Sequence, residues 1–148
     1  MRRVTFGLML ALTIALVACA RQEPAPRAAA PPAPAFKPIA TVKQVMQGIT
    51  IPASNAVFAV AGQAPADDAA WQAVEASAMA VAESGNLLLM SPRAVAEQEW
   101  TQYAVALIDA GAKAAEAARA KNADQTSTAG DDMYNVCEQC HAKYMKKP

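Results

Sequence analysis

The chain has 148 residues, in which 13 Lys and Arg side chains balance 13 Asp and Glu side chains. This even balance leaves no basic field of the kind that binds nucleic acid. The chain has three cysteines and one histidine, so it offers few ligands for a metal site built from protein side chains alone.

The first 18 residues have the pattern of an export signal. Arg2 and Arg3 give a basic start, and the run from Val4 to Val17 is almost wholly apolar. This run is shorter than the roughly 20 apolar residues that a transmembrane helix needs. We therefore predict a cleaved signal peptide over residues 1–18 and an exported protein. Its removal would leave 11 basic and 13 acidic side chains, a formal charge of −2.

The apolar run ends in Leu16-Val17-Ala18-Cys19, which resembles the lipobox of bacterial lipoproteins. The resemblance implies that Cys19 is lipidated, becomes the first mature residue and anchors the protein to a membrane on its periplasmic side. Ala20 differs from the aspartate that retains some lipoproteins in the inner membrane, so the outer membrane is favoured. The alternative is a plain signal peptide with Cys19 present by chance.

Composition divides the rest of the chain into a spacer and one domain. Residues 19–38 are rich in Ala and contain six prolines, a composition that cannot bury a core and favours extended conformations. The remaining residues, 39–148, number about 110 and suit a single domain. We expect this domain to be all-α, because alanine is abundant and no hairpin signal appears.

Four segments of the domain have apolar or small residues at helical spacing. The predicted helices cover Thr41–Ala61, Asp68–Leu89, Pro92–Lys121 and Thr128–Met145. Asp67 is a candidate N-cap of the second helix, and Ser91-Pro92 is a candidate start of the third. Asn122–Gly130 is expected to be a polar connection. Four helices with short connections predict an up-down-up-down four-helix bundle.

Pro52 interrupts the pattern of the first helix. It lacks the N–H that would bond to the carbonyl of Gly48, so a kink or a break is expected there. The apolar stripe predicted for this helix consists of Val42, Met46, Ile49, Ala53, Ala56 and Val60. In the second and third helices, the large stripe residues are interpreted as core residues rather than site residues, these being Trp71, Trp100, Tyr103 and Leu107.

The fourth helix carries Cys137-Glu138-Gln139-Cys140-His141, the Cys-x-x-Cys-His pattern of covalent c-type haem attachment. Cysteines three residues apart lie on the same side of a helix or tight turn, where their thiols can add to the two vinyl groups of one porphyrin edge. His141 then supplies an imidazole ligand to the iron. The motif predicts one haem c, and export agrees with it because such haem is attached outside the cytoplasm.

Three other uses of this motif stay open from the sequence. A disulfide between Cys137 and Cys140 would leave His141 without a role. A zinc site would need a fourth ligand, and the only other cysteine is Cys19. A thioredoxin-like redox pair would need a βαβ setting, whereas nothing in the chain predicts a strand.

The layout resembles the class II c-type cytochromes, the group of cytochrome c′ and cytochrome c556, over roughly residues 41–147. The resemblance implies a four-helix bundle whose last helix carries the covalent haem near the C-terminus. The segment Val42–Met46 resembles the part of the first helix that supplies a methionine in the c556 type. The chain departs from the family at Pro52, in its spacer and lipobox, and at Val136, where a basic residue often precedes the first cysteine.

His141 is the only histidine, so the sixth ligand of the iron is a methionine, another group or none. Met46 fits best, because an up-down-up-down order puts the start of the first helix level with the end of the fourth. The other methionines of the domain are less well placed by helix order, these being Met79, Met90, Met133 and Met145. A core methionine is the alternative role for Met46.

The sixth ligand decides the predicted function. Ligation by His141 and Met46 favours single-electron transfer by a membrane-anchored cytochrome. An open sixth position would favour binding or sensing of NO or CO, and an accessory haem subunit of a membrane oxidoreductase is a third alternative. No nucleophile–base pair, paired carboxylates or phosphate loop indicates an enzyme. The redox partner is not identified, and a homodimer, common among class II bundles, stays open.

Overall fold

The computed structural model describes residues 36–145, which belong to one compact unit, Ala35–Pro148. The predicted signal peptide, the lipidation site Cys19 and most of the spacer lie outside the described residues. All regular structure in the described part is helical, without strands, which confirms the all-α fold class. No helix among these residues combines the length and the apolar character needed to cross a membrane.

The first predicted helix forms one helical run with a wider turn inside it. The run consists of α1 (Val42–Val45), a π-helical turn (Met46–Thr50), α2 (Ile51–Phe58) and a 3₁₀ turn (Ala59–Ala61). The N–H of Ile51 donates to the carbonyl of Met46, which closes the π turn just before Pro52. The wider turn accommodates a proline that can neither donate to Gly48 nor pack closely against its carbonyl. The expected kink or break is thus a π turn within a continuous run.

The π turn shifts the buried face of this run. Its buried residues are Val45, Thr50, Ser54, Val57 and Val60. Val45 and Thr50 are five residues apart, because the π turn contains one residue more than an α-helical turn. The predicted stripe is therefore wrong at Ile49, whose side chain is 37% exposed.

The second long helix, α3 (Asp68–Leu89), has the predicted bounds. The carboxylate of its N-cap, Asp67, accepts a hydrogen bond from the N–H of Ala70 at 2.8 Å. Trp71, predicted to be a core residue, is buried, as are Val74, Ala78, Val81, Gly85 and Leu88 at helical spacing on the same face. The N-cap signal at Asp67 and the helical spacing of apolar residues were sufficient to predict this element.

The third helix, α4 (Gln98–Arg119), begins later than the predicted start at Pro92. The preceding residues, 90–97, form a non-helical connection. Within it, the Arg93 side chain donates to the carbonyls of Leu87 at 2.6 Å and Ala40 at 3.1 Å. These bonds reach residues outside the connection, so the Ser91-Pro92 signal alone did not show where the helix begins.

The fourth helix, α5 (Ala123–Tyr144), begins earlier than the predicted start at Thr128. Lys121 adopts a positive φ of 54° after the end of α4, a conformation common just beyond helix C-termini. Asn122 then caps α5, since its side-chain oxygen accepts from the N–H of Gln125 at 3.0 Å. The predicted polar connection Asn122–Gly130 is therefore wrong, because residues from Ala123 onward already belong to the helix.

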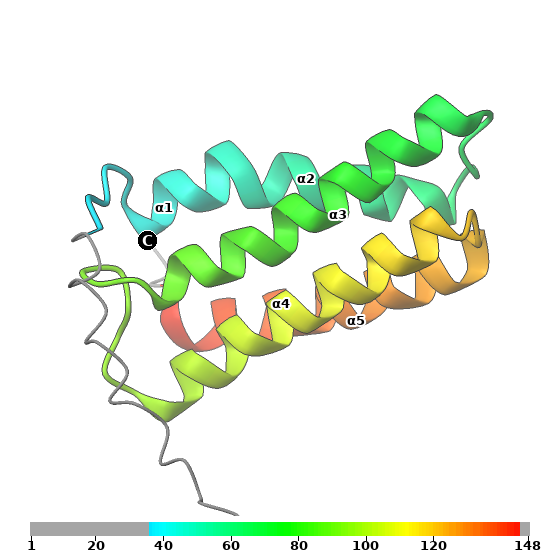
Figure 1. Ribbon diagram of the computed structural model, residues 1–148. Helices are drawn as coiled ribbons and strands as arrows, with labels where there is room; N and C mark the ends of the chain where they lie inside the picture. The colour runs from blue at the N-terminus through cyan, green and yellow to red at the C-terminus, as the bar shows by residue number, and fades with distance from the viewer. Residues whose placement is uncertain (1–35, 146–148) are drawn as a thin grey trace, which may run out of the picture. The chain divides into compact units, whose positions relative to one another are not determined.

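Contacts between helices build a bundle in which α4 packs against α3 and α5, and the first run packs against α3 and α5 (Figure 1). Arg119, in the last turn of α4, forms an ion pair of 2.7 Å with Glu75 in α3. The Tyr144 hydroxyl at the end of α5 donates to Glu97, just before α4, at 2.8 Å. The end of α5 is therefore fixed beside the start of α4.

Candidate functional site

A small cavity lies where the C-terminal part of α5 meets the π turn, α3 and α4. Its volume is about 30 Å³. Its lining includes Met46, Cys137, Cys140 and His141. The structure thus brings all three motif residues and the candidate sixth ligand to one cavity, although Met46 and the motif lie at opposite ends of the domain sequence.

The motif occupies one face of α5. Cys137 is followed by Cys140 and His141 at three and four residues, the spacings that share a helix face. Both cysteines are free thiols and are partly buried. Burial raises the pKa of both thiols, and the neighbouring Cys140 raises the pKa of Cys137 further. Both thiols are therefore protonated at neutral pH in this structure.

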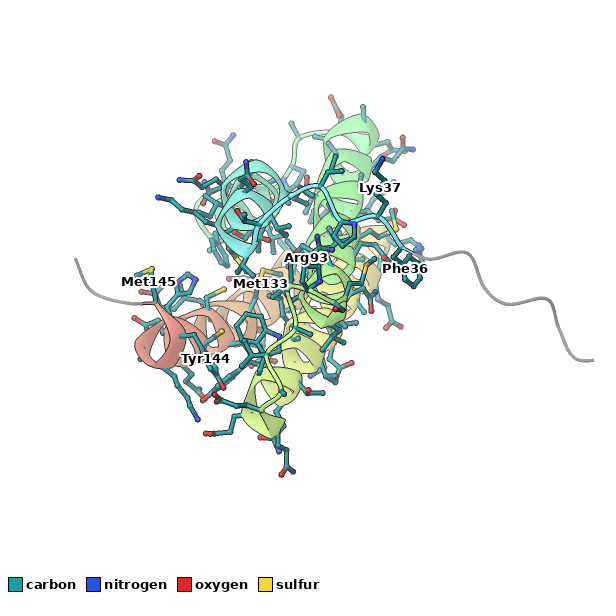
Figure 2. All side chains as sticks on the ribbon, turned by 90° about the vertical axis from the view of Figure 1, so that its left-hand side faces the viewer. Phe36, Lys37, Arg93, Met133, Tyr144 and Met145 are labelled. Carbon is teal, nitrogen blue, oxygen red and sulfur yellow. The ribbon has the colours of Figure 1, made fainter. Side chains whose placement is uncertain are left out.

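The last turn of α5 is fastened to the start of α4 beside the cavity. Figure 2 looks onto this end of the bundle and shows Tyr144 there. The Tyr144 ring packs edge-on against Trp100, with ring centroids 5.1 Å apart, and Lys143 forms ion pairs with Glu97 and Glu99. Burial and the hydrogen bond to Glu97 raise the pKa of Tyr144 to about 12. These contacts fix the turn that follows His141.

Met46 is the only methionine of residues 36–145 that lines this cavity. Met133 is fully buried in the core, whereas Met79 and Met145 are 45% and 61% exposed. The sulfur of Met90 lies 3.6 Å from Nη2 of Arg93. The expected order of the helices selected Met46 from the sequence, and in the structure Met46 and His141 line the same cavity.

The remaining cavity walls come from residues that were not singled out for the site. Thr50, Leu88, Ala104 and Val136 line the cavity, as do three residues assigned only to the core, namely Trp100, Tyr103 and Leu107. Trp100 and Leu107 are buried, so their core role holds as well. Periodicity alone identifies a buried face, and only the packing of four elements shows which part of that face borders the motif.

The donor set fits a c-type haem. In the described part of the chain, no cluster of three or more His, Cys, Asp or Glu side chains is arranged to hold a metal ion. Two thiols, an imidazole and a thioether on apolar walls are, by contrast, the groups that attach and ligate a haem. A cavity of about 30 Å³ holds little more than one water molecule. Accommodating a macrocycle therefore requires the walls to move apart.

The motif also reaches the surface. Cys137 and His141 border an open hollow together with Tyr134, Glu138 and Met145. Tyr134 and Met145 are 50% and 61% exposed, so this hollow is open to solvent. Cys137 and His141 therefore border both the inner cavity and the surface hollow.

Comparisons of the chain with models of protein families, with curated proteins and with solved structures each found no match. The function of the chain must therefore be inferred from its own residues and their arrangement.

Proposed function

We propose that this protein is an exported, lipid-anchored c-type cytochrome that carries one haem c and transfers single electrons. The observation that carries the proposal is the joint placement of Met46, Cys137, Cys140 and His141 around one cavity. Contacts between the end of α5 and the start of α4 support an up-down-up-down bundle of the class II type. Cys19 would anchor this bundle to the periplasmic side of a membrane through the Ala- and Pro-rich spacer.

The residues of the site divide the task of holding the cofactor. Cys137 and Cys140 would hold the haem covalently through two thioethers, each thiol adding its S–H across one vinyl group. His141 would ligate the iron through its imidazole, and Met46 would ligate it through its thioether sulfur. The bound haem contributes a one-electron iron couple, whose potential thioether ligation raises.

The surroundings of these residues suit electron transfer. Leu88, Trp100 and Leu107 are at most 6% exposed, so the walls that they form are shielded from water. The contacts of Tyr144 and Lys143 with Glu97, just before α4, would restrain the α5 turn that follows His141. On the other side, Cys137 and His141 border the surface hollow, which gives a partner protein a short path to the site.

The proposed ligation of the iron by Met46 can be tested directly by replacing this residue. The ferric wild-type protein should show the weak near-infrared band of His–Met ligation, and the ferrous protein should not bind CO. Met46→Ala should lose the band, bind CO and have a lower reduction potential. Truncating a buried methionine costs about 2–5 kcal/mol and Met46 is only partly buried, so the spectrum rather than the stability is the readout.

Met79→Ala is the matched control, because Met79 is 45% exposed and does not line the cavity. It should keep the wild-type spectrum and potential. A wild-type protein that is already high-spin and binds CO at once would contradict ligation by Met46 and favour NO or CO binding. Purification from membranes in fixed stoichiometry with an oxidoreductase would instead identify an accessory haem subunit.

A further inference from the structure

We propose that Arg93 is a positioning residue for Met46, because it clamps the segment that leads into the Met46 helix onto the end of α3. Arg93 is 8% exposed and is the only charged residue in the buried set of residues 36–145. Its Nε donates to the carbonyl of Leu87 at 2.6 Å, and its Nη1 donates to the carbonyl of Ala40 at 3.1 Å. This inference rests on the proposed role of Met46 as a haem ligand.

The bonding of Arg93 is that of a clamp rather than of an ion pair. A buried charge is costly unless its donors are satisfied, and buried arginines usually face a carboxylate. No acidic side chain in the described part of the chain forms an ion pair with Arg93. Its planar guanidinium group instead joins two backbone segments that lie far apart in the sequence. One of the two carbonyls, that of Leu87, belongs to the last turn of α3, where its helix supplies only a long hydrogen bond of 3.4 Å from the N–H of the C-cap Met90.

The two clamped segments are those that frame the cavity. Ala40 directly precedes Thr41, the N-cap from which a single α-helical turn leads to Met46. Leu87 directly precedes Leu88, which lines the cavity and whose carbonyl accepts a hydrogen bond from Trp100 Nε1 at 3.0 Å.

Figure 2 shows Arg93 at this end of the bundle, where the first helical run begins and α3 ends. Because only one turn separates the clamp from Met46, a displaced Ala40 would displace the sulfur as well. The position of the Met46 sulfur depends most on Arg93 when the cavity walls move apart to admit a macrocycle. The clamp then holds the start of the first helical run in place while the rest of the run adjusts.

The test measures how easily an external ligand displaces Met46 from the iron. In the haem-loaded full chain, Arg93→Met should bind imidazole in the ferric state at least about tenfold more tightly than wild type. That factor corresponds to the loss of hydrogen bonds made by a charged donor. Arg93→Lys keeps the charge but cannot reproduce the two-armed fork, so it should bind imidazole several-fold more tightly. If the Arg93→Met protein does not accumulate in a folded form, the imidazole affinity of Arg93→Lys provides the test.

Two controls separate positioning from general destabilisation. Val60→Ala removes contacts in the separate apolar cluster around Trp71, so it should lower the unfolding temperature without changing imidazole affinity. In a Met46→Ala background, Arg93→Met should have no further effect on imidazole affinity, because no sulfur remains to be displaced.

Two results would overturn the inference, and they are distinguishable. If the wild-type protein shows His–Met ligation while both Arg93 variants bind imidazole as wild type does, Arg93 does not position Met46 and the proposed function stands. If the wild-type protein lacks the His–Met band, the proposed ligand and its positioning residue fail together.

Discussion

Tyr144 shows at the residue scale how a single side chain fastens the Cys-x-x-Cys-His motif to the bundle. Its hydroxyl donates to Glu97 at 2.8 Å, and its ring packs edge-on against Trp100, a favourable aromatic geometry. His141 precedes Tyr144 by three residues on the same helix, so fixing Tyr144 also fixes the turn that carries the imidazole.

The raised pKa of Tyr144 makes this contact sensitive to alkali. Because the pKa rises from 10.0 to about 12 in the folded protein, the folded state holds this proton more tightly than the unfolded chain. The resulting stabilisation is complete below about pH 10 and is lost as the pH rises towards 12. The free energy of unfolding should therefore fall more steeply over this range in wild type than in Tyr144→Phe, which keeps the ring. Denaturant titrations between pH 7 and 12 measure both slopes, and equal slopes would contradict the assignment.

At the scale of elements, α3 and α4 approach so closely that glycine is required at their contact. A Cβ at Gly111 in α4 would lie 2.6 Å from the backbone nitrogen of Ala82 and 3.0 Å from the carbonyl oxygen of Ala78. A Cβ at Gly85 in α3 would lie 2.9 Å from the carbonyl oxygen of Ala104. A Cβ at Gly85 would also lie 2.6 Å from Cγ1 of the Ile108 side chain, but the other neighbours are backbone atoms, which cannot turn aside to make room.

Gly111→Ala should therefore push the two helices apart and destabilise the fold by about 1–3 kcal/mol, the usual cost of overpacking. Gly48→Ala is the matched control, because a Cβ at Gly48 meets nothing within 4 Å. Alanine is the better helix former by about 1 kcal/mol, so Gly48→Ala should unfold at or above the wild-type temperature. Thermal unfolding followed by circular dichroism compares the two variants. A Gly111→Ala variant as stable as wild type would contradict the close approach of the helices.

The elements also show which parts of the fold could be predicted from the sequence. The bounds of α3 were correct because its cap at Asp67 and its apolar stripe are local signals. The predicted start of α4 was wrong, because the segment before it is held by Arg93, which bonds to the distant Ala40. The predicted start of α5 was wrong as well, because the chain turns already at Lys121, which adopts a left-handed conformation. For the candidate site, the helix order expected from the sequence was sufficient to predict that Met46 lies near the motif. The π turn that exposes Ile49 and buries Thr50 has no clear sequence signal apart from Pro52.

For the whole molecule, the anchoring prediction concerns Cys19, which lies outside the described residues. Wild-type protein should fractionate with membranes and carry lipid mass, since stable anchoring needs more than one acyl chain. Cys19→Ser should release the protein into the soluble fraction or leave the precursor uncleaved. Its haem content should not change, because Cys19 is not part of the Cys-x-x-Cys-His motif. Wild-type protein that is wholly soluble and carries no lipid would contradict the anchor.

The central claim is covalent haem attachment through Cys137 and Cys140, and the most direct measurement is haem staining after denaturing electrophoresis. The protein is produced with export and haem-attachment machinery, and the mass of the intact chain is measured in parallel. We expect the wild-type and Cys19→Ser bands to retain haem, and the double variant Cys137→Ala/Cys140→Ala to lose both the stain and the added mass. A wild-type band of the correct mature polypeptide that carries no haem would contradict the account.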